Sequence, residues 1–352
     1  SEVVGAGEDT VEEKTGANPN TRLPRGATAF WPAPAPVAIR VPPAIPGPSP
    51  GYAQRKPPIV KNCFLPPRSP PASIRGMKSA RDPSAASGKA LRRLIECLID
   101  AARRDVKRLS GSHEAVATHQ LRVRMKKLLS LLRLGRDCMP DHTFEAMRMH
   151  IRAVKNACAG NRDIVVRDKL VEKLSRRFHI TPKHEIIPLR KLPPPSASFL
   201  QHQLCALEQL IDTTRIDHLT PEQVIAAHAI SYRKGRRLMK EAYDGARDQT
   251  LHRWRHRVKD LHYQTLALPS LPGSSRRVRR SRKLGSLLGR ERDLANLANE
   301  PAYAVKRGAW SHLIHEHRSQ LLERILLLGH KVYDPAAQQF HHKMEKQLEV
   351  TE

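Results

Sequence analysis

The stretch HQLRVRMKKLL, from His119 to Leu129, sets one histidine and four cations among regularly spaced apolar residues. In an α-helix, which turns by about 100° per residue, these residues separate onto two neighbouring faces. One face collects Leu121, Met125, Leu128 and Leu132, and the other collects His119, Arg122, Lys126 and Arg133. The stretch therefore predicts a helix with one side in a core and a cationic stripe beside it.

The cationic stripe needs a partner, because like charges three and four residues apart on a helix repel one another. Between His119 and Met139 the only acidic residue is Asp137. This local shortage of carboxylates favours an external anion. The alternative is that the cations extend into water from a solvated helix face, as most basic runs do.

A second copy of the stretch lies further along the chain. Aligned without a gap, HQLRVRMKKL (119–128) and HRWRHRVKDL (252–261) agree at five of ten positions. His252, Arg255 and Lys259 occupy the positions of His119, Arg122 and Lys126. The match predicts duplication of a helical unit.

Each copy is followed about forty residues later by a second matching element, CAGNRD (158–163) or LGRERD (288–293). We expect Asp163 and Asp293 each to begin a new helix and to cap its free N–H groups. The preceding arginines, Arg162 and Arg292, suit bidentate contact with phosphate. Either arginine could equally serve only as the ion-pair partner of its aspartate.

Helical periodicity extends over residues 86–348, with strand-like alternation nearly absent, so the sequence predicts an all-α protein. The proline-rich break ITPKHEIIPLRKLPPPS (180–196) divides this region into halves of about 86–180 and 197–348. The expected helices are 88–109, 113–137, 143–159, one after Asp163, 199–212, 221–243, 250–268, 275–288, one from Leu294, 310–329 and 335–348. Thr220 followed by Pro221 is a strong start signal: a cap, then proline at the first helical position.

Residues 1–85 differ in composition from the rest. They hold 17 of the 28 prolines and show no sustained period, so we expect an extension that is disordered or locally polyproline II. Its PxxP-like runs could bind a protein partner, or the segment could be a flexible extension.

The charge of the chain limits its partners. Sixty-two Lys and Arg against 34 Asp and Glu give a formal net charge of +28, which attracts polyanions: nucleic acid, an anionic membrane or a phosphate polymer. Aromatic residues are only 4%, too few to favour stacking of unpaired bases. The five scattered cysteines indicate a reducing compartment, and no apolar run approaches the ~20 residues of a membrane span. We therefore expect a cytoplasmic protein with no membrane span.

The doubled elements resemble the CHAD family, the conserved histidine α-helical domain. Its H-x-x-R-V-x-x-[RK]-[RK] pattern is met at His119, Arg122, Val123, Lys126 and Lys127. Its second-half patterns are met at His252, Arg255, Lys259, His262 and Tyr263, and at Leu288, Gly289 and Asp293. The L-G-x-x-R-D-x-x-V pattern is met in part at Arg162, Asp163 and Val166.

The resemblance implies two four-helix bundles related by a pseudo-twofold axis, enclosing a basic channel that binds inorganic polyphosphate and can place a protein on polyphosphate granules. Polyphosphate carries about one charge per residue and no bases, which suits a site rich in cations and poor in aromatics. The predicted contact residues are His119, Arg122, Lys126, Lys127, Arg133, Arg152, Lys155, Arg162, His252, Arg255, Lys259, Tyr263, Arg279, Arg282 and Lys283.

Other functions fit the sequence less well. No ExExK, GxxxxGK[ST] or nucleophile-elbow motif occurs, so we expect no catalysis and no cofactor. The histidines of HLIHEH (312–317) invite a metal, but His317 points away from His312, so we expect no metal site. Nonspecific nucleic-acid binding is the main alternative, with RRVRRSRK (276–283) as a backbone-contacting arm. The last alternative is a scaffold function, in which the positive charge recruits acidic proteins.

Overall fold

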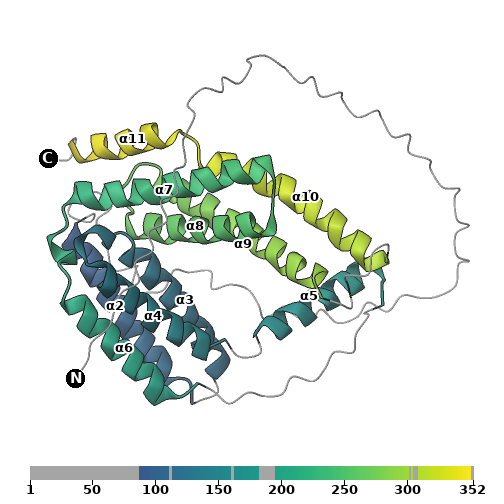
Figure 1. Cartoon of the computed structure of the whole chain (residues 1–352), viewed down its shortest axis with the longest axis horizontal. Helices are drawn as coiled ribbons and strands as arrows, with labels where there is room; N and C mark the ends of the chain where they lie inside the picture. Colours follow the sequence, from purple (N-terminus) through teal and green to yellow (C-terminus); the bar gives the residue numbers. More distant parts are fainter. Residues whose placement is uncertain are drawn as a thin grey trace, which may run out of the picture. The chain divides into compact units, whose positions relative to one another are not determined.

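The computed structural model describes residues 87–110, 113–159, 162–181, 195–300, 303 and 308–349. Within these residues the chain forms ten α-helices and two short 3-10 helices and no strand, so the all-α prediction is confirmed (Figure 1). The extension 1–85 and most of the proline-rich break lie outside the described residues, and the prediction of disorder for the extension stays a prediction.

Four helices form the first packing group: α2 (Gly88–Lys107), α3 (Glu114–Leu132), α4 (Asp141–Ala157) and α6 (Ala197–Asp212) (Figure 1). Helix α3 packs on α2 and α4, and α6 packs on α2 and α4. The apolar face predicted for α3 lies in the core, with Leu121, Met125, Leu128 and Leu132 fully buried. The periodic leucines of the opening stretch therefore position α3 as predicted.

The second packing group contains α7 (Pro221–Asp244), α8 (Asp248–Ala267), α9 (Ser274–Ala298) and α10 (Ala309–Val332). Helix α11 (Ala337–Glu349) packs on α7, where the rings of Phe340 and Tyr232 stack with centroids 3.9 Å apart. Stacked aromatic pairs of this kind add to the stabilisation from burial alone.

The packing groups do not follow the order of the chain. Helix α5 (Arg162–Phe178) packs on α9 of the second group, whereas α6, which follows the proline-rich break, packs in the first. The two groups therefore exchange a helix relative to the two sequence halves. The pseudo-twofold relation between the halves stays a prediction.

The start signal at α7 is confirmed. Thr220 Oγ1 accepts a hydrogen bond from the Gln223 backbone N–H at 3.4 Å, and Gln223 Oε1 accepts one from the Thr220 N–H at 3.0 Å. This reciprocal capping box satisfies two backbone donors that the first turn of a helix leaves without partners.

The prediction of two helices between 275 and 300 is wrong. Helix α9 runs without interruption through Gly289 to Ala298, so Asp293 lies inside it and does not begin a helix (Figure 1). The glycines at 285 and 289 weaken helix propensity locally, but both are buried, and tertiary packing outweighs that cost of about 1 kcal/mol each.

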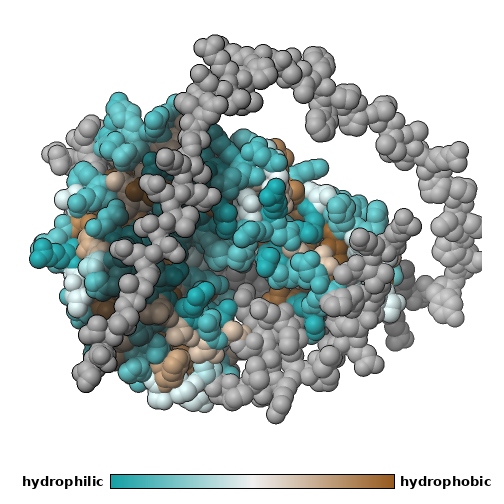
Figure 2. All heavy atoms as spheres, viewed as in Figure 1, coloured by the Kyte–Doolittle hydropathy of each residue, from teal (hydrophilic) through white to brown (hydrophobic). Residues whose placement is uncertain are grey.

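The surface is mostly polar. Figure 2 shows hydrophilic residues over most of the described part of one face, with smaller apolar patches between them. Among the described residues, no helix is long and apolar enough to cross a membrane.

Candidate anion-binding site

The two helices that carry the repeated motif, α3 and α8, pack directly on each other. Ser130 Oγ on α3 donates to the backbone carbonyl of Asp260 on α8 at 3.1 Å, and Gln264 Nε2 on α8 donates to the carbonyl of Ser130 at 3.0 Å. All three residues are buried. The two helices that carry the cationic stripes are thereby held together.

A carboxylate from the second half meets the end of the first stripe. Arg133 Nη1 lies 2.5 Å from Asp260 Oδ1, and Arg257 Nη1 lies 3.2 Å from Asp260 Oδ2. Burial raises the pKa of Asp260, while Arg133 and Arg257 oppose that rise. The shortage of carboxylates inferred from residues 119–139 therefore does not hold for Arg133, and Arg124 likewise pairs with Asp105 of α2 at 2.5 Å.

Cations and histidines gather from α3 and its C-terminal end and from α4, α8 and α9, and the charges of the cations act on neighbouring members of this set. We call this set the cationic cluster. It comprises Arg122, Lys127, Arg133, Arg152, Lys155, His252, Arg255, His256, Lys259, Arg282 and Arg292. Residues of both motif copies therefore share one electrostatic site.

Lys155 shows how the cluster is built in the first half. Burial lowers the pKa of Lys155, and the positive charges of Arg122, Arg152 and Arg133 lower it further. Arg122 Nη1 donates to the backbone carbonyl of Lys155, which fixes the guanidinium against α4. A half-buried ammonium in such a field is stabilised by an added anion.

Lys259 is the corresponding case in the second half. Burial lowers the pKa of Lys259, and Arg255 and Arg282 lower it further. Burial followed by the charge of Arg124 lowers the pKa of Lys127 in the same way. Within the described part of the chain, Lys127, Lys155 and Lys259 have no carboxylate within ion-pair distance.

Two buried glycines of α9 make room for the cations of α8. A Cβ atom at Gly285 would lie 3.2 Å from Lys259 Cε, and one at Gly289 would lie 3.4 Å from Arg255 Nη2. The first distance is tighter than ordinary van der Waals contact, whereas the second is at the lower limit of ordinary contact. The absence of a Cβ at these positions lets Lys259 and Arg255 lie across α9, which gives Gly289 of the L-G pattern a physical role.

The buried His262 connects the cluster back to the first half. Burial lowers the pKa of His262 to about 4, and the charges of Lys259, Arg282 and Lys127 contribute to the lowering. Its Nδ1 lies 3.3 Å from Ser281 Oγ on α9. Neutral His262 thus ties α8 to α9 beneath the cations.

The predicted contact residues are only partly brought together. Tyr263 lies next to the cluster, where burial raises its pKa and Arg255 opposes the rise. Lys283 instead lines a pocket of about 200 Å³ between α9 and α10, and Arg279 is exposed. His119 is exposed and Lys126 half-buried on α3, while the side chain of Arg162 lies outside the described residues.

Sequence reasoning missed one member of the cluster, His256, and left a second, Arg292, out of the predicted contact residues. His256 lies one turn after His252 on α8, so helical spacing alone could have placed both on one face. Arg292 had been judged suited to phosphate contact, with the ion pair to Asp293 as the alternative. The segment 276–283, considered as an arm, belongs to α9, and Arg277 lies over the ring of Phe340 at 4.6 Å.

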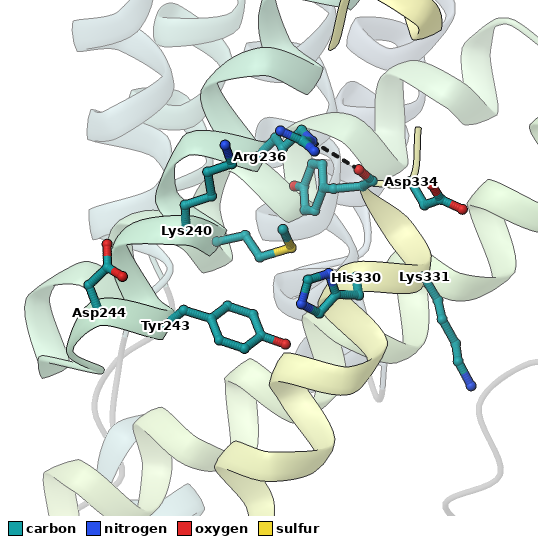
Figure 3. A pocket seen from close by; sticks show the side chains of 9 residues that line it. Arg236, Lys240, Tyr243, Asp244, His330, Lys331 and Asp334 are labelled. Carbon is teal, nitrogen blue, oxygen red and sulfur yellow. Dashed lines mark hydrogen bonds between the residues drawn. The ribbon is translucent and has the colours of Figure 1, made fainter. Parts of the chain in front are cut away.

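A larger pocket of about 500 Å³ lies between α7 and the end of α10 (Figure 3). The rings of Tyr243 and His330 lie side by side in its lining, tilted with centroids 4.7 Å apart, and Arg236 Nε donates to the Tyr333 carbonyl at 3.2 Å. This pocket shares no residue with the cationic cluster. Its cations are accompanied by Asp244 and Asp334, so it is the weaker site for an anion.

The histidines of HLIHEH do not converge. The ring of His317 contacts Phe178 of α5, with centroids 5.1 Å apart, and the exposed His312 and His315 lie elsewhere on α10. In the described ranges, no three His, Cys, Asp or Glu side chains are grouped as a metal site would need.

Comparison with known families identifies the class. The model of the CHAD domain matches residues 89–302, which span helices α2 to α9. The chain therefore belongs to the CHAD domain family, as the paired motifs predicted. A search of the curated proteins finds no match.

Proposed function

We propose that this protein binds inorganic polyphosphate, without catalysis, through the cationic cluster. The observation that carries the proposal is the direct packing of α3 on α8, which gathers cations of both motif copies into one site. Membership in the CHAD family, which is associated with polyphosphate binding, supports the same ligand.

The charge arrangement favours a polymer over a single small anion. The charges of several arginines act on Lys155 of α4 and on Lys259 of α8, and His256 is within reach of both Lys155 and Arg255. A linear polyanion with about one charge per phosphate can neutralise several of these groups at once. Its binding would relieve repulsion that the empty site retains.

We further infer that the two motif copies form the walls of one channel related by a pseudo-twofold axis. Arg122 reaches from α3 to the backbone of α4, and Arg255, at the equivalent position of α8, reaches across α9 at Gly289. This parallel supports the channel, since each motif arginine is held by the helix that follows it.

A binding role fits the cluster better than hydrolysis of phosphate bonds. Metal-assisted phosphoryl chemistry uses carboxylates to hold metal ions or to activate water. The carboxylate that meets the cluster, Asp260, is held by Arg133 and Arg257.

Nonspecific nucleic-acid binding is the second candidate, and the basic start of α9 favours it. Arg276, Arg279 and Arg282 are exposed there. Diffuse contact with a phosphate backbone would need little more than such a surface.

Charge reversal tests the proposed site. The double change Arg122→Glu and Arg255→Glu should weaken polyphosphate binding at least about a hundredfold, since each charged contact contributes roughly 1.5–3 kcal/mol. A matched control, Lys107→Glu with Lys343→Glu, makes the same change in net charge at exposed positions of α2 and α11. Circular dichroism of both variants checks that helix content is retained.

The outcomes separate a built site from diffuse charge. Loss of binding in the first variant but not in the control supports the cluster. Equal loss in both variants, or retention in both, contradicts it.

The proposed ligand also predicts where the protein lies in the cell. A cytoplasmic protein that binds polyphosphate through the cluster should gather on polyphosphate granules, whether or not the proline-rich extension recruits a protein partner there. A fluorescent fusion that stays on granules after Arg122→Glu with Arg255→Glu would argue against this.

A further inference from the structure

Two histidines of the cationic cluster are in direct contact. His252 and His256 lie one turn apart on α8, with their Nε2 atoms 3.0 Å apart and their ring centroids 4.6 Å apart. At this distance one imidazole donates a hydrogen bond to the other when both are neutral. An added proton would go to the Nδ1 atom of the donating ring, since one proton already lies between the two Nε2 atoms.

The charges around this pair come from every helix of the cluster. Arg255 belongs to α8 itself, Arg292 to α9, Lys155 to α4, and Arg133 to the end of α3. The nearby carboxylate of Asp260, one turn further along α8, is bound by Arg133 and Arg257. The pair therefore faces a surplus of positive charge.

This field keeps the pair neutral at physiological pH. Loss of hydration and the positive charges of His252, Arg255, Lys155 and Arg133 lower the pKa of His256 to about 4. Loss of hydration followed by the charges of Arg292 and Arg255 lowers the pKa of His252. Nδ1 of His252 is buried and has no hydrogen-bond partner among the described residues.

We propose that the His252–His256 pair takes up a proton when polyphosphate binds, so that the affinity for the polymer is linked to pH. The inference rests on the proposed function. The phosphate charges would cancel the field of the surrounding cations, and the protonated pair would then donate hydrogen bonds to phosphate oxygens.

The pair belongs to one motif copy alone. The residue of the first copy equivalent to His256 is Val123, so His119 has no histidine one turn after it. The substitution His256→Val therefore gives α8 the residue that the first copy carries. His256→Gln is a second variant that keeps a polar side chain of similar length.

The direction of the effect follows from linkage. If the complex holds one more proton than the separate partners, the affinity rises as pH falls, by at most about tenfold per pH unit. Long polyphosphate isolates the effect, because only its chain ends titrate near neutral pH.

The experiment is titration calorimetry of the full chain with long-chain polyphosphate at pH 6.5, in buffers of different ionisation enthalpy. Affinity is also measured from pH 8 to pH 6 at constant ionic strength. The wild type and the control His142→Gln, at an exposed position of α4, should take up about one proton and bind more tightly at pH 6. His256→Val and His256→Gln should lose most of that uptake and most of the pH dependence.

The variants are compared by the slope of log affinity against pH. A substitution that alters the affinity at pH 8 therefore does not affect the comparison. Polymer binding without proton uptake, or with unchanged uptake in both His256 variants, overturns the inference and leaves the proposed function standing. No polymer binding at any pH in this range overturns the proposed function itself.

Discussion

Arg133, at the end of α3, places its Nη1 atom 2.5 Å from Oδ1 of Asp260 on α8. One partner comes from the first sequence half and the other from the second, and Asp260 is almost fully buried. The ion pair therefore acts at the junction of the two motif helices. Arg133 itself has no acidic residue closer in sequence than Asp137, so this carboxylate reaches it only through the packing of α3 on α8.

Removing that carboxylate should weaken the fold. Asp260→Asn leaves Arg133 and Arg257 without their shared charge in a poorly hydrated position, which should lower the free energy of unfolding by about 3 kcal/mol. Urea denaturation measures the change. The control Glu96→Gln breaks an exposed pair with Arg92 and should cost less than about 1 kcal/mol. Equal effects would show that Asp260 has no special structural role.

The glycines of α9 should matter more for binding than for stability. Gly285→Ala displaces Lys259, and polyphosphate affinity should fall by about fivefold, equivalent to losing roughly 1 kcal/mol of a charged contact. Gly289→Ala brings its Cβ only into ordinary contact with Arg255 and should lower the affinity less. Stability should not fall, because alanine favours a helix over glycine by about 1 kcal/mol and the displaced atoms belong to flexible side chains.

Gly235→Ala is the contrasting variant, measured by the same binding and urea assays. Its Cβ would overlap the rigid ring of Tyr333, so it should destabilise the fold by about 1–3 kcal/mol. Tight polymer binding by both α9 variants would remove these glycines from the account of the site.

Acidification should destabilise the fold through His228. This histidine is fully buried beside Gln264, and burial lowers its pKa to about 4, below the ordinary value of 6.5. The unfolded chain therefore binds the extra proton between these values, and stability is lost as pH falls from about 6.5 toward 4, by up to about 1.4 kcal/mol per pH unit.

Urea denaturation from pH 7 to pH 4.5 measures this slope, which should be smaller in His228→Gln. Because acid weakens the fold here but strengthens polymer binding through the His252–His256 pair, the two effects have opposite signs. An unchanged slope in the variant would assign the acid sensitivity to other groups.

The cysteines should differ sharply in reactivity. Burial raises the pKa of Cys158 to about 11, so almost none of its thiol is ionised at pH 8, whereas Cys97 and Cys205 are exposed. Iodoacetamide at pH 8 should modify Cys97 and Cys205 first, and Cys158 only after unfolding in urea. Peptide mass mapping over time follows each site, and early modification of Cys158 would contradict its burial.

Local patterns were sufficient for most of the fold. The leucine spacing of 119–129 predicted the buried face of α3, and Thr220 with Pro221 predicted the start of α7, since both features depend on neighbours within one or two turns. The repeated cationic motif also led to the correct family.

The features that the sequence did not predict depend on contacts between residues far apart in the chain. Asp260 reaches Arg133 only because α3 packs on α8, and no local signal predicted the exchange of α5 and α6 between the packing groups. The continuity of α9 was missed because Asp293 was expected to cap a new helix, whereas α9 runs through this residue to Ala298.

The most direct test of the central claim is a competition experiment. Residues 86–352 carry every described helix and are titrated, alongside the full chain, with long-chain polyphosphate, duplex DNA and single-stranded DNA at equal phosphate content and at two salt concentrations. A site built from the α3 and α8 stripes predicts that polyphosphate is preferred and that the preference persists at physiological salt. Equal binding of all three polymers, lost together as salt rises, would contradict it and leave only the diffuse attraction of a +28 chain.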